Sequence, residues 1–177
     1  MLIQKDALQV RYLEEKDKPL LANWLSNPNV LQFYEGRDQP FDLEQVNKVF
    51  YGNDREGRCM VEFGGKEIGY IQFYTLDDIT KATYGYNDQI IYGIDQFIGE
   101  EDYWNKGIGK LLVTSMARYL IKQKSAERVV MDPQIRNQRA IRCYEKSGFI
   151  KVKKLPKHEL HEGEYQDCWL MEYGNVL

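Results

Sequence analysis

The 177-residue chain has few of the residues that build disulfide frameworks and metal centres. Its three cysteines are Cys59, Cys143 and Cys168, and its only histidines are His158 and His161. An odd number of widely spaced cysteines does not indicate a disulfide framework, so we expect reduced thiols. Both histidines lie in a charged stretch, H-E-L-H-E, which lacks the H-E-x-x-H spacing of zinc enzymes and leaves no evident base for a cysteine nucleophile. We therefore expect neither a metal site nor thiol catalysis.

The chain also lacks a long apolar run and a strong charge of either sign. The first 18 residues, MLIQKDALQVRYLEEKDK, carry acidic residues early and match neither a signal peptide nor a membrane span. The net charge of −3 is not the basic excess that is typical of nucleic-acid-binding proteins. We expect a cytoplasmic protein with no membrane or nucleic-acid partner, whereas the number of subunits is not indicated.

No internal repeat or low-complexity linker divides the sequence, and its length suits one domain, residues 1–177. Hydrophobic periodicity predicts strands at 8–12, 58–63, 67–76, 89–98, 127–132, 149–155 and 165–173. The same patterns predict helices at 15–25, 42–50, 107–124 and 137–147. Segments 75–89 and 156–164 are expected to be polar or charged loops. This order predicts an α/β fold with a mixed sheet and helices on both faces.

The segment Ile90–Leu112 joins an apolar strand to a helix start through Lys106-Gly107-Ile108-Gly109. Backbone N–H groups at a helix N-terminus carry partial positive charge and bind phosphate groups. Glycine suits such a turn because a Cβ would block the close approach of the phosphate. A G-x-G pattern also occurs in ordinary turns, so both interpretations stay open on this segment alone.

Further motifs follow at a characteristic spacing. W-N-K-G-I-G (Trp104–Gly109) comes after the strand, and DPQIRNQRAIRCYEKSGF (Asp132–Phe149) comes about thirty residues later. Together they resemble the GNAT superfamily of acetyl-CoA-dependent N-acetyltransferases. Finer features, G-I-D-Q-F-I-G-E (Gly93–Glu100) and M-D-P (Met131–Pro133), resemble the aminoglycoside 6′-N-acetyltransferases of that superfamily. The resemblance implies a GNAT fold, with a mostly antiparallel central sheet of about seven strands flanked by helices on both faces.

The same resemblance implies an activity. The protein would transfer acetyl from acetyl-CoA to the 6′-amine of an aminoglycoside antibiotic, directly within a ternary complex, and so confer resistance. Other amines are the alternative within the fold, such as a polyamine or a ribosomal-protein N-terminus. A non-catalytic CoA-binding sensor is a second alternative, but the presence of both Asp95 and Tyr144 argues against it.

The acetyl-CoA contacts implied by the resemblance are mostly made by backbone. The strand edge would pair with the pantetheine amides, and the helix start would hold the pyrophosphate. The implied residues are Gln96, Phe97, Ile98, Trp104, Lys106, Gly107, Ile108, Gly109, Lys110 and Asn137. Trp104 replaces the Gln or Arg that is usual in the family, so we assign no phosphate contact to its side chain. Asn137 also fits an ordinary helix N-cap.

The resemblance assigns catalysis to Asp95 and Tyr144. Asp95 lies within an apolar strand, where it either caps nearby backbone or faces a cleft and holds the substrate ammonium. With a pKa near 3.9, an aspartate is a weak base for an amine with a pKa near 10, so its first role would be orientation, unless burial raises its pKa. Tyr144 would protonate the leaving sulfur of CoA, although its helical spacing also fits a core aromatic.

A polycationic aminoglycoside requires carboxylates in its cleft. We expect four residues to bind the substrate: Tyr34, Tyr92, Asp95 and Asp132. Asp132 precedes Pro133 and equally fits a turn residue. Weaker candidates are the acids Glu35, Asp77, Asp78 and Asp88, since charges in loops are usually solvated.

Overall fold

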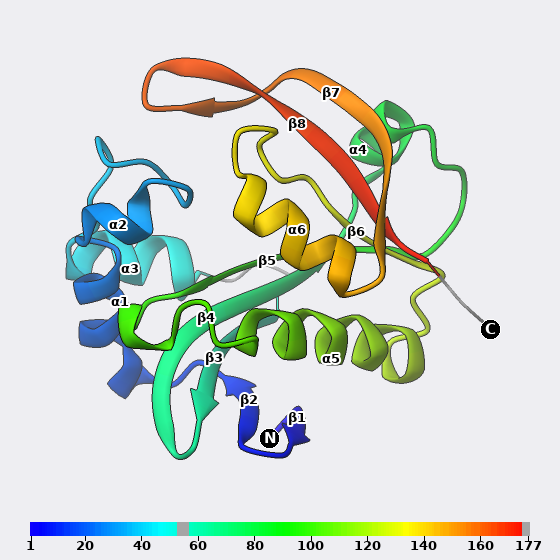
Figure 1. Cartoon of the computed structure of the whole chain (residues 1–177). Helices are drawn as coiled ribbons and strands as arrows, with labels where there is room; N and C mark the ends of the chain where they lie inside the picture. The colour runs from blue at the N-terminus through cyan, green and yellow to red at the C-terminus, as the bar shows by residue number, and fades with distance from the viewer. Residues whose placement is uncertain (53–56, 175–177) are drawn as a thin grey trace.

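The computed structural model describes residues 1–52 and 57–174, which form an eight-stranded sheet ordered β1-β2-β3-β4-β5-β6-β8-β7 (Figure 1). The strands are β1 (Ile3–Lys5), β2 (Leu8–Tyr12), β3 (Gly57–Phe63), β4 (Lys66–Thr75), β5 (Ile91–Ile98), β6 (Arg128–Met131), β7 (Phe149–His161) and β8 (Glu164–Tyr173). Neighbouring strands in this sheet run antiparallel, apart from the parallel pair β5–β6. The expectation of a mixed, mostly antiparallel sheet is confirmed, with one strand more than the seven expected.

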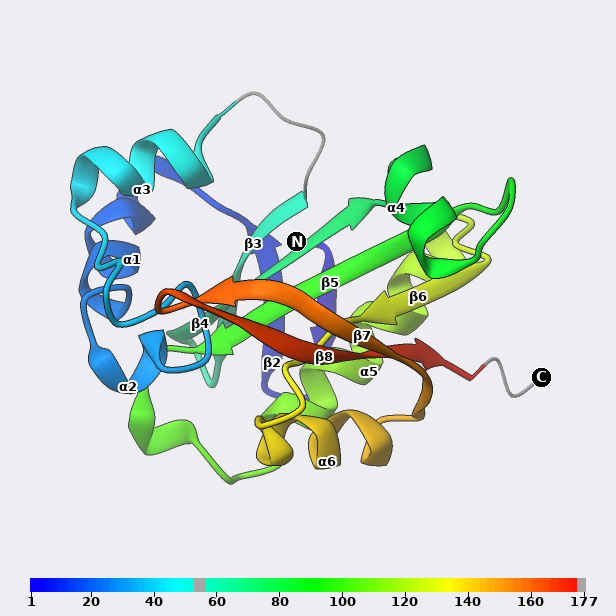
Figure 2. The same cartoon turned by 90° about the horizontal axis from the view of Figure 1, so that it is seen from above.

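Helices cover both faces of the sheet (Figure 2). They are α1 (Lys18–Trp24), α2 (Pro28–Leu31), α3 (Leu43–Phe50), α4 (Asp78–Tyr84), α5 (Ile108–Gln123) and α6 (Gln138–Lys146), with 3-10 turns at Glu15–Asp17 and Glu101–Tyr103. Within the described ranges, no helix is both long and apolar enough to cross a membrane.

Strand β5 takes part in two cores because its side chains alternate between the faces of the sheet. Ile94 packs with Leu112 and Met116 of α5 on one face. Phe97 packs with Trp24 of α1 and Tyr70 of β4 on the other face. Consequently, even-numbered β5 residues face α5 and odd-numbered ones face α1–α3, which decides where the functional side chains of this strand lie.

A cleft opens where β5 and β6 separate. Their pairing reaches only Gly93 and Val130, whereas β5 continues to Ile98. Beyond β6, the chain turns toward β8: the backbone N–H of Trp169 donates to Pro133 O, and that of Ile135 donates to Asp167 O, both at 2.9 Å. The second half of β5 is thus left without a β6 partner, and its edge lines the opening.

Two loop predictions were wrong. Segment 75–89 contains α4, in which Asp77 Oδ1 accepts the Thr80 N–H at 2.7 Å and Gly85 ends the helix with a φ of +83°. Seven residues that include two threonines give no clear helical face, so these two capping residues were the available signal.

The charged stretch 156–164 belongs mostly to β7, which runs on to His161 and turns at Glu162-Gly163 into β8. Because β7 lies at the edge of the sheet, it tolerates Pro156 and a break in register between Leu155 and Glu159. The tip of this hairpin reaches the loop after α2, where Arg37 Nε lies 2.6 Å from Glu162 Oε1 (Figure 1). The hairpin therefore spans the opening between β5 and β6.

Candidate active site

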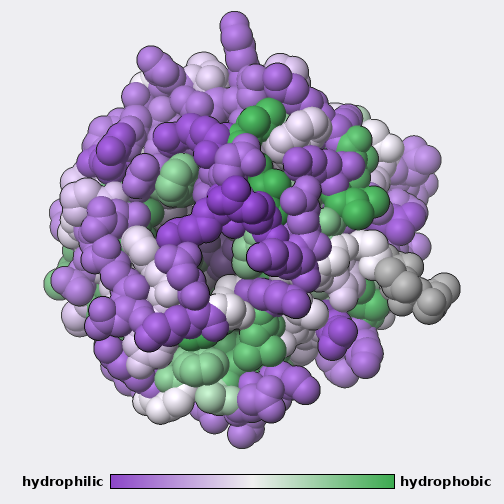
Figure 3. All heavy atoms as spheres, in the orientation of Figure 1, coloured by the Kyte–Doolittle hydropathy of each residue, from purple (hydrophilic) through white to green (hydrophobic). Residues whose placement is uncertain are grey.

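The opening between β5 and β6 is a cleft of about 960 Å³. The surface of the molecule around this cleft is largely hydrophilic and is hollowed near its middle (Figure 3). The residues predicted for the site that line it are Tyr34, Asp95, Gln96, Phe97, Ile98, Trp104, Lys106, Gly107, Ile108, Gly109, Lys110, Asp132, Asn137 and Tyr144. Tyr92 alone among the predicted site residues is missing from this lining.

One end of the cleft is formed by the start of α5. Gly107 precedes the helix with a φ of +77°, a conformation that glycine adopts without strain. A Cβ at Gly107 would meet open space rather than protein. The backbone N–H of Leu111 donates to the N-cap carbonyl, Gly107 O, at 3.2 Å, which leaves the N–H groups of Ile108, Gly109 and Lys110 without acceptors inside the helix. A pyrophosphate fits this turn because both the exposed N–H groups and the helix dipole favour an anion.

Basic side chains surround the same end. The Arg139 guanidinium lies 4.9 Å from the centre of the Trp104 ring, and the Trp104 indole N–H donates to Ile98 O at 2.8 Å. Trp104 thus anchors the turn to β5, and its ring contacts the Arg139 cation. The basic residues on the cleft lining are Lys106, Lys110, Arg139, Arg142 and Lys146. Arg139 and Arg142 of α6 were not predicted as site residues, because the motif does not show which way their side chains point.

Asn137 caps α6, and its Oδ1 accepts the Ala140 N–H at 3.3 Å. The N-cap interpretation is therefore confirmed. Asn137 also lines the cleft, so a contact with CoA is compatible with this position.

Asp95 is held at the other end of the cleft by residues of β4. Gln72 lies opposite it in the sheet, and Gln72 Nε2 donates to Asp95 Oδ2 at 3.0 Å. Gln72 Oε1 in turn accepts the Tyr70 hydroxyl at 2.7 Å. Tyr74 also hydrogen-bonds Asp95, and its ring lies across Gly93, where an added Cβ would come within 2.5 Å of it. The glycine of the G-I-D-Q motif therefore makes room for a partner of the aspartate.

The ionisation of Asp95 is shifted by its surroundings. Burial raises the pKa of Asp95 to about 7, and the negative charge of Asp132 acts in the same direction. The hydrogen bonds from Gln72 and Tyr74 oppose this shift in the pKa. Near neutral pH, the carboxylate is therefore a better proton acceptor than an ordinary aspartate.

Three more carboxylates line this end: Glu35, Asp132 and Glu159. Burial raises the pKa of Glu159, which accepts a hydrogen bond from Gln134 Nε2 at 2.8 Å. Burial also raises the pKa of Glu35, and Glu159 adds to the shift. The pKa values of Asp95, Glu35 and Glu159 are thus all raised within one end of the cleft, where the ammonium groups of a polycationic substrate would offset the negative charges.

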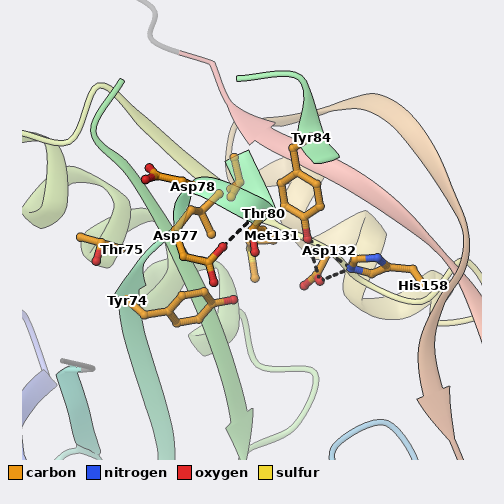
Figure 4. Close-up of a pocket in the computed structure, with 11 residues that line it drawn as sticks. Tyr74, Thr75, Asp77, Asp78, Thr80, Tyr84, Met131, Asp132 and His158 are labelled. Carbon is orange, nitrogen blue, oxygen red and sulfur yellow. Dashed lines mark hydrogen bonds and ion pairs between the residues drawn. The ribbon is translucent and has the colours of Figure 1, made fainter. Parts of the chain in front are cut away.

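Asp132 also borders a second cavity of about 730 Å³ beneath α4 (Figure 4). Its Oδ2 lies 2.8 Å from His158 Nε2 and accepts the Tyr84 hydroxyl at 3.3 Å. The hydrogen bond to Asp132 raises the pKa of His158. Asp132 is thus hydrogen-bonded by Tyr84 and His158 on one side, and it also lines the cleft.

Tyr144 lies on the α5 side of β5, opposite Asp95. Its hydroxyl accepts a hydrogen bond from Gln96 Nε2 at 2.7 Å, and its ring packs 6.3 Å from that of Phe149.

Burial raises the pKa of the neighbouring Cys143 thiol, which makes that cysteine a poor nucleophile.

Comparisons with known proteins agree with this geometry. Residues 14–156 match the acetyltransferase (GNAT) domain family. The chain belongs to the GNAT acetyltransferase family. It is 27% identical over 149 residues to "Aminoglycoside N(6')-acetyltransferase type 1" of Klebsiella pneumoniae, covering 81% of this chain and 74% of that protein.

Solved GNAT structures share the fold. AAC(6')-Ib in complex with ribostamycin and coenzyme A superposes with a TM-score of 0.73 at 23% identity, over 96% of this chain and 94% of that one. The spermidine N-acetyltransferase of Vibrio cholerae in complex with CoA and spermine superposes with a TM-score of 0.76 at 19% identity, over 94% of each chain. The same fold therefore occurs with two classes of polycationic ligand.

Two tyrosines predicted to bind substrate in this GNAT protein differ in position. Tyr34 follows α2, lines the cleft and packs 4.7 Å from the Phe97 ring. Tyr92 instead packs against Phe73 at 6.2 Å on the α5 face. Since Tyr92 and Asp95 are an odd number of residues apart on one strand, they point to opposite faces. We therefore do not retain Tyr92 in the substrate site.

Of the loop acids, Asp77 and Asp78 line the second cavity rather than the cleft. Gln72, Gln134 and Glu159 belong to the cleft but were missed as substrate-site residues. Gln72 and Gln134 offered only a polar side chain within or just after a predicted strand, and Glu159 lay in a stretch that was predicted to be a charged loop.

Proposed function

We propose that this GNAT protein transfers acetyl from acetyl-CoA to a primary amine of a polycationic substrate, and that this amine is the 6′-amine of an aminoglycoside. The observation that carries the proposal is that Asp95 and three further carboxylates line one end of a cleft, while basic side chains line its other end. The basic end suits the phosphates of CoA, whereas the acidic end suits ammonium groups.

The acetyl group would pass directly from acetyl-CoA to the amine, with both substrates bound at once. Asp95 would orient the substrate amine and accept its proton, directly or through a water, as the amine nitrogen bonds to the thioester carbonyl carbon. The C–S bond would break, and Tyr144 would donate its hydroxyl proton to the departing sulfur. Because the thiol of CoA has a pKa near 8.5, its thiolate is a good leaving group even without a proton. The contribution of Tyr144 to the rate should therefore be smaller than that of Asp95.

Polyamine acetylation is the second candidate. The spermidine N-acetyltransferase similarity supports it, and a row of carboxylates suits a linear polyamine as well. The aminoglycoside is favoured by the identity to an aminoglycoside N(6')-acetyltransferase and by the G-I-D-Q and M-D-P features.

The test is thiol release from acetyl-CoA with three amines: a kanamycin bearing a 6′-amine, a close analogue with a 6′-hydroxyl, and spermidine. Release with the 6′-amine alone supports the proposal, and the mass and NMR spectra of the product would locate the acetyl group. Release with spermidine alone would transfer the proposal to polyamines. No release with any of the three, together with tight acetyl-CoA binding, would point to a sensor.

A further inference from the structure

Gln96 occupies a position between the two reacting partners of the proposed transfer. Its backbone belongs to the free edge of β5, and its side chain points to the α5 side, where Tyr144 lies. The amide Nε2 donates to the Tyr144 hydroxyl oxygen at 2.7 Å. Since this donor occupies a lone pair of the phenol oxygen, the phenol proton stays free to point elsewhere.

The other half of the Gln96 amide is unusual. Its Oε1 is buried and, among the described residues, has no hydrogen-bond partner, although Gln96 lines the cleft. A buried amide oxygen without a donor is costly, so a residue that carries such an atom beside a cleft is a candidate to accept a hydrogen bond from a ligand. The pantetheine arm of CoA carries two amide N–H groups and would lie along this strand edge.

We propose that Gln96 is a positioning residue that locks Tyr144 to the cofactor: Nε2 holds the phenol oxygen while Oε1 accepts an N–H from the pantetheine arm. This inference rests on the proposed acetyl transfer and deepens it. One rigid amide would then set the Tyr144 proton at a constant distance from the sulfur that must receive it.

Two substitutions separate the two halves of the amide. Gln96→Glu keeps the size and an oxygen acceptor but replaces the donor with a carboxylate oxygen, which would instead accept the Tyr144 proton. Gln96→Met removes both polar atoms at similar volume. We expect Gln96→Glu to bind acetyl-CoA within about 3-fold of the wild type and to lose about 10-fold in kcat. We expect Gln96→Met to lose kcat and also to weaken acetyl-CoA binding by about 3- to 10-fold.

The decisive control repeats both substitutions in a Tyr144→Phe background. If Gln96 acts through Tyr144, neither substitution should lower kcat further there, whereas a general structural defect would multiply with the loss of the hydroxyl. Wild-type kcat in Gln96→Glu, or multiplicative losses with Tyr144→Phe, would overturn the inference. Thermal melting identifies a variant that fails to fold; Gln96→Met then carries the test for Gln96→Glu.

Failure of the proposed function would look different. If the wild type releases no thiol with any amine, the transfer itself fails. Acetyl-CoA binding by Gln96→Met then still tests the contact of Oε1, because it needs no turnover.

Discussion

The two ends of the cleft are built in different ways. At the basic end, the edge of β5 and the start of α5 lie within residues 96–110 and offer backbone groups, and α6 adds the side chains of Arg139, Arg142 and Lys146. The acidic end collects Glu35, Asp95, Asp132 and Glu159 from four separate segments. Backbone donors survive most side-chain changes, whereas each carboxylate is a single functional group. The comparison implies that single substitutions should damage the acidic end far more than the basic end.

The largest effect is expected for Asp95→Asn. Turnover should fall by about 10²-fold or more because the amide cannot accept the amine proton, while the affinity for acetyl-CoA changes by less than about 2-fold. Steady-state kinetics and calorimetric titration with acetyl-CoA check this. In the wild type, the acid limb of kcat/KM should have an apparent pKa near 7, the value that burial gives Asp95. Unchanged turnover in Asp95→Asn would refute the role of the carboxylate.

The same substitution should stabilise the fold above neutral pH. The pKa of Asp95 is about 7 in the folded protein and near 3.8 in the unfolded chain. Between about pH 4 and pH 7 the unfolded chain loses this proton while the folded protein keeps it, so the free energy of unfolding falls as the pH rises. Asp95→Asn should raise Tm at pH 8 by about 2–8 °C, equivalent to about 1–2 kcal/mol, with a smaller difference at pH 5. A lower Tm at pH 8 would show that the Gln72 and Tyr74 hydrogen bonds outweigh the cost of burial.

Asp132→Asn should have the next effect. Because Asp132 would bind a substrate ammonium, we expect KM for the amine to rise about 10-fold or more with little change in acetyl-CoA affinity. The matched control is Asp78→Asn, which makes the same charge change at a fully exposed side chain. Equal effects of the two would mean that net charge, rather than contact, governs substrate affinity.

Smaller losses are expected at the basic end. Lys106→Ala and Lys110→Ala should each weaken acetyl-CoA binding by less than about 3-fold, since the N–H groups of α5 remain in place. Arg139→Ala should cost somewhat more because the Trp104 ring holds this cation against the cleft. Binding titrations measure these losses. A 10-fold or larger loss in either lysine variant would show that side-chain charge dominates this end as well.

The smallest effect is expected for the contact between His158 and Asp132. The hydrogen bond to Asp132 raises the pKa of His158, so the ion pair stabilises the fold below about pH 6.5 and is lost as pH rises through the raised pKa. His158→Gln should lower the free energy of unfolding at pH 6 by less than about 1 kcal/mol, with a correspondingly small fall in Tm, and should leave Tm at pH 9 nearly unchanged. Melting curves at both pH values test this; an equal loss at both would mean that His158 acts by packing alone.

Much of this arrangement could be predicted from short patterns. The glycine turn before Ile108, the N-cap at Asn137 and the motif spacing between Trp104 and Phe149 predicted the turn at the basic end of the cleft and the family. Element boundaries followed from periodicity in β2, β4 and α5. The boundaries of helix α4 and of the extension of β7 did not, because the short helix lacks an apolar face and the end of the edge strand, residues 156–161, is mostly polar or charged.

The sequence by itself determined the elements and the backbone cradle, because propensity, alternation and helix caps act over a few residues. Only the tertiary structure decided which polar side chains meet. It turned the chain after Met131 away from β5, brought Glu159 over from the edge strand, and placed Gln96 beside Tyr144 while Tyr92 went to the core. The physical reason is that the pKa of Asp95 depends on burial and on charges from distant segments, which strand pairing and the direction of each side chain bring together.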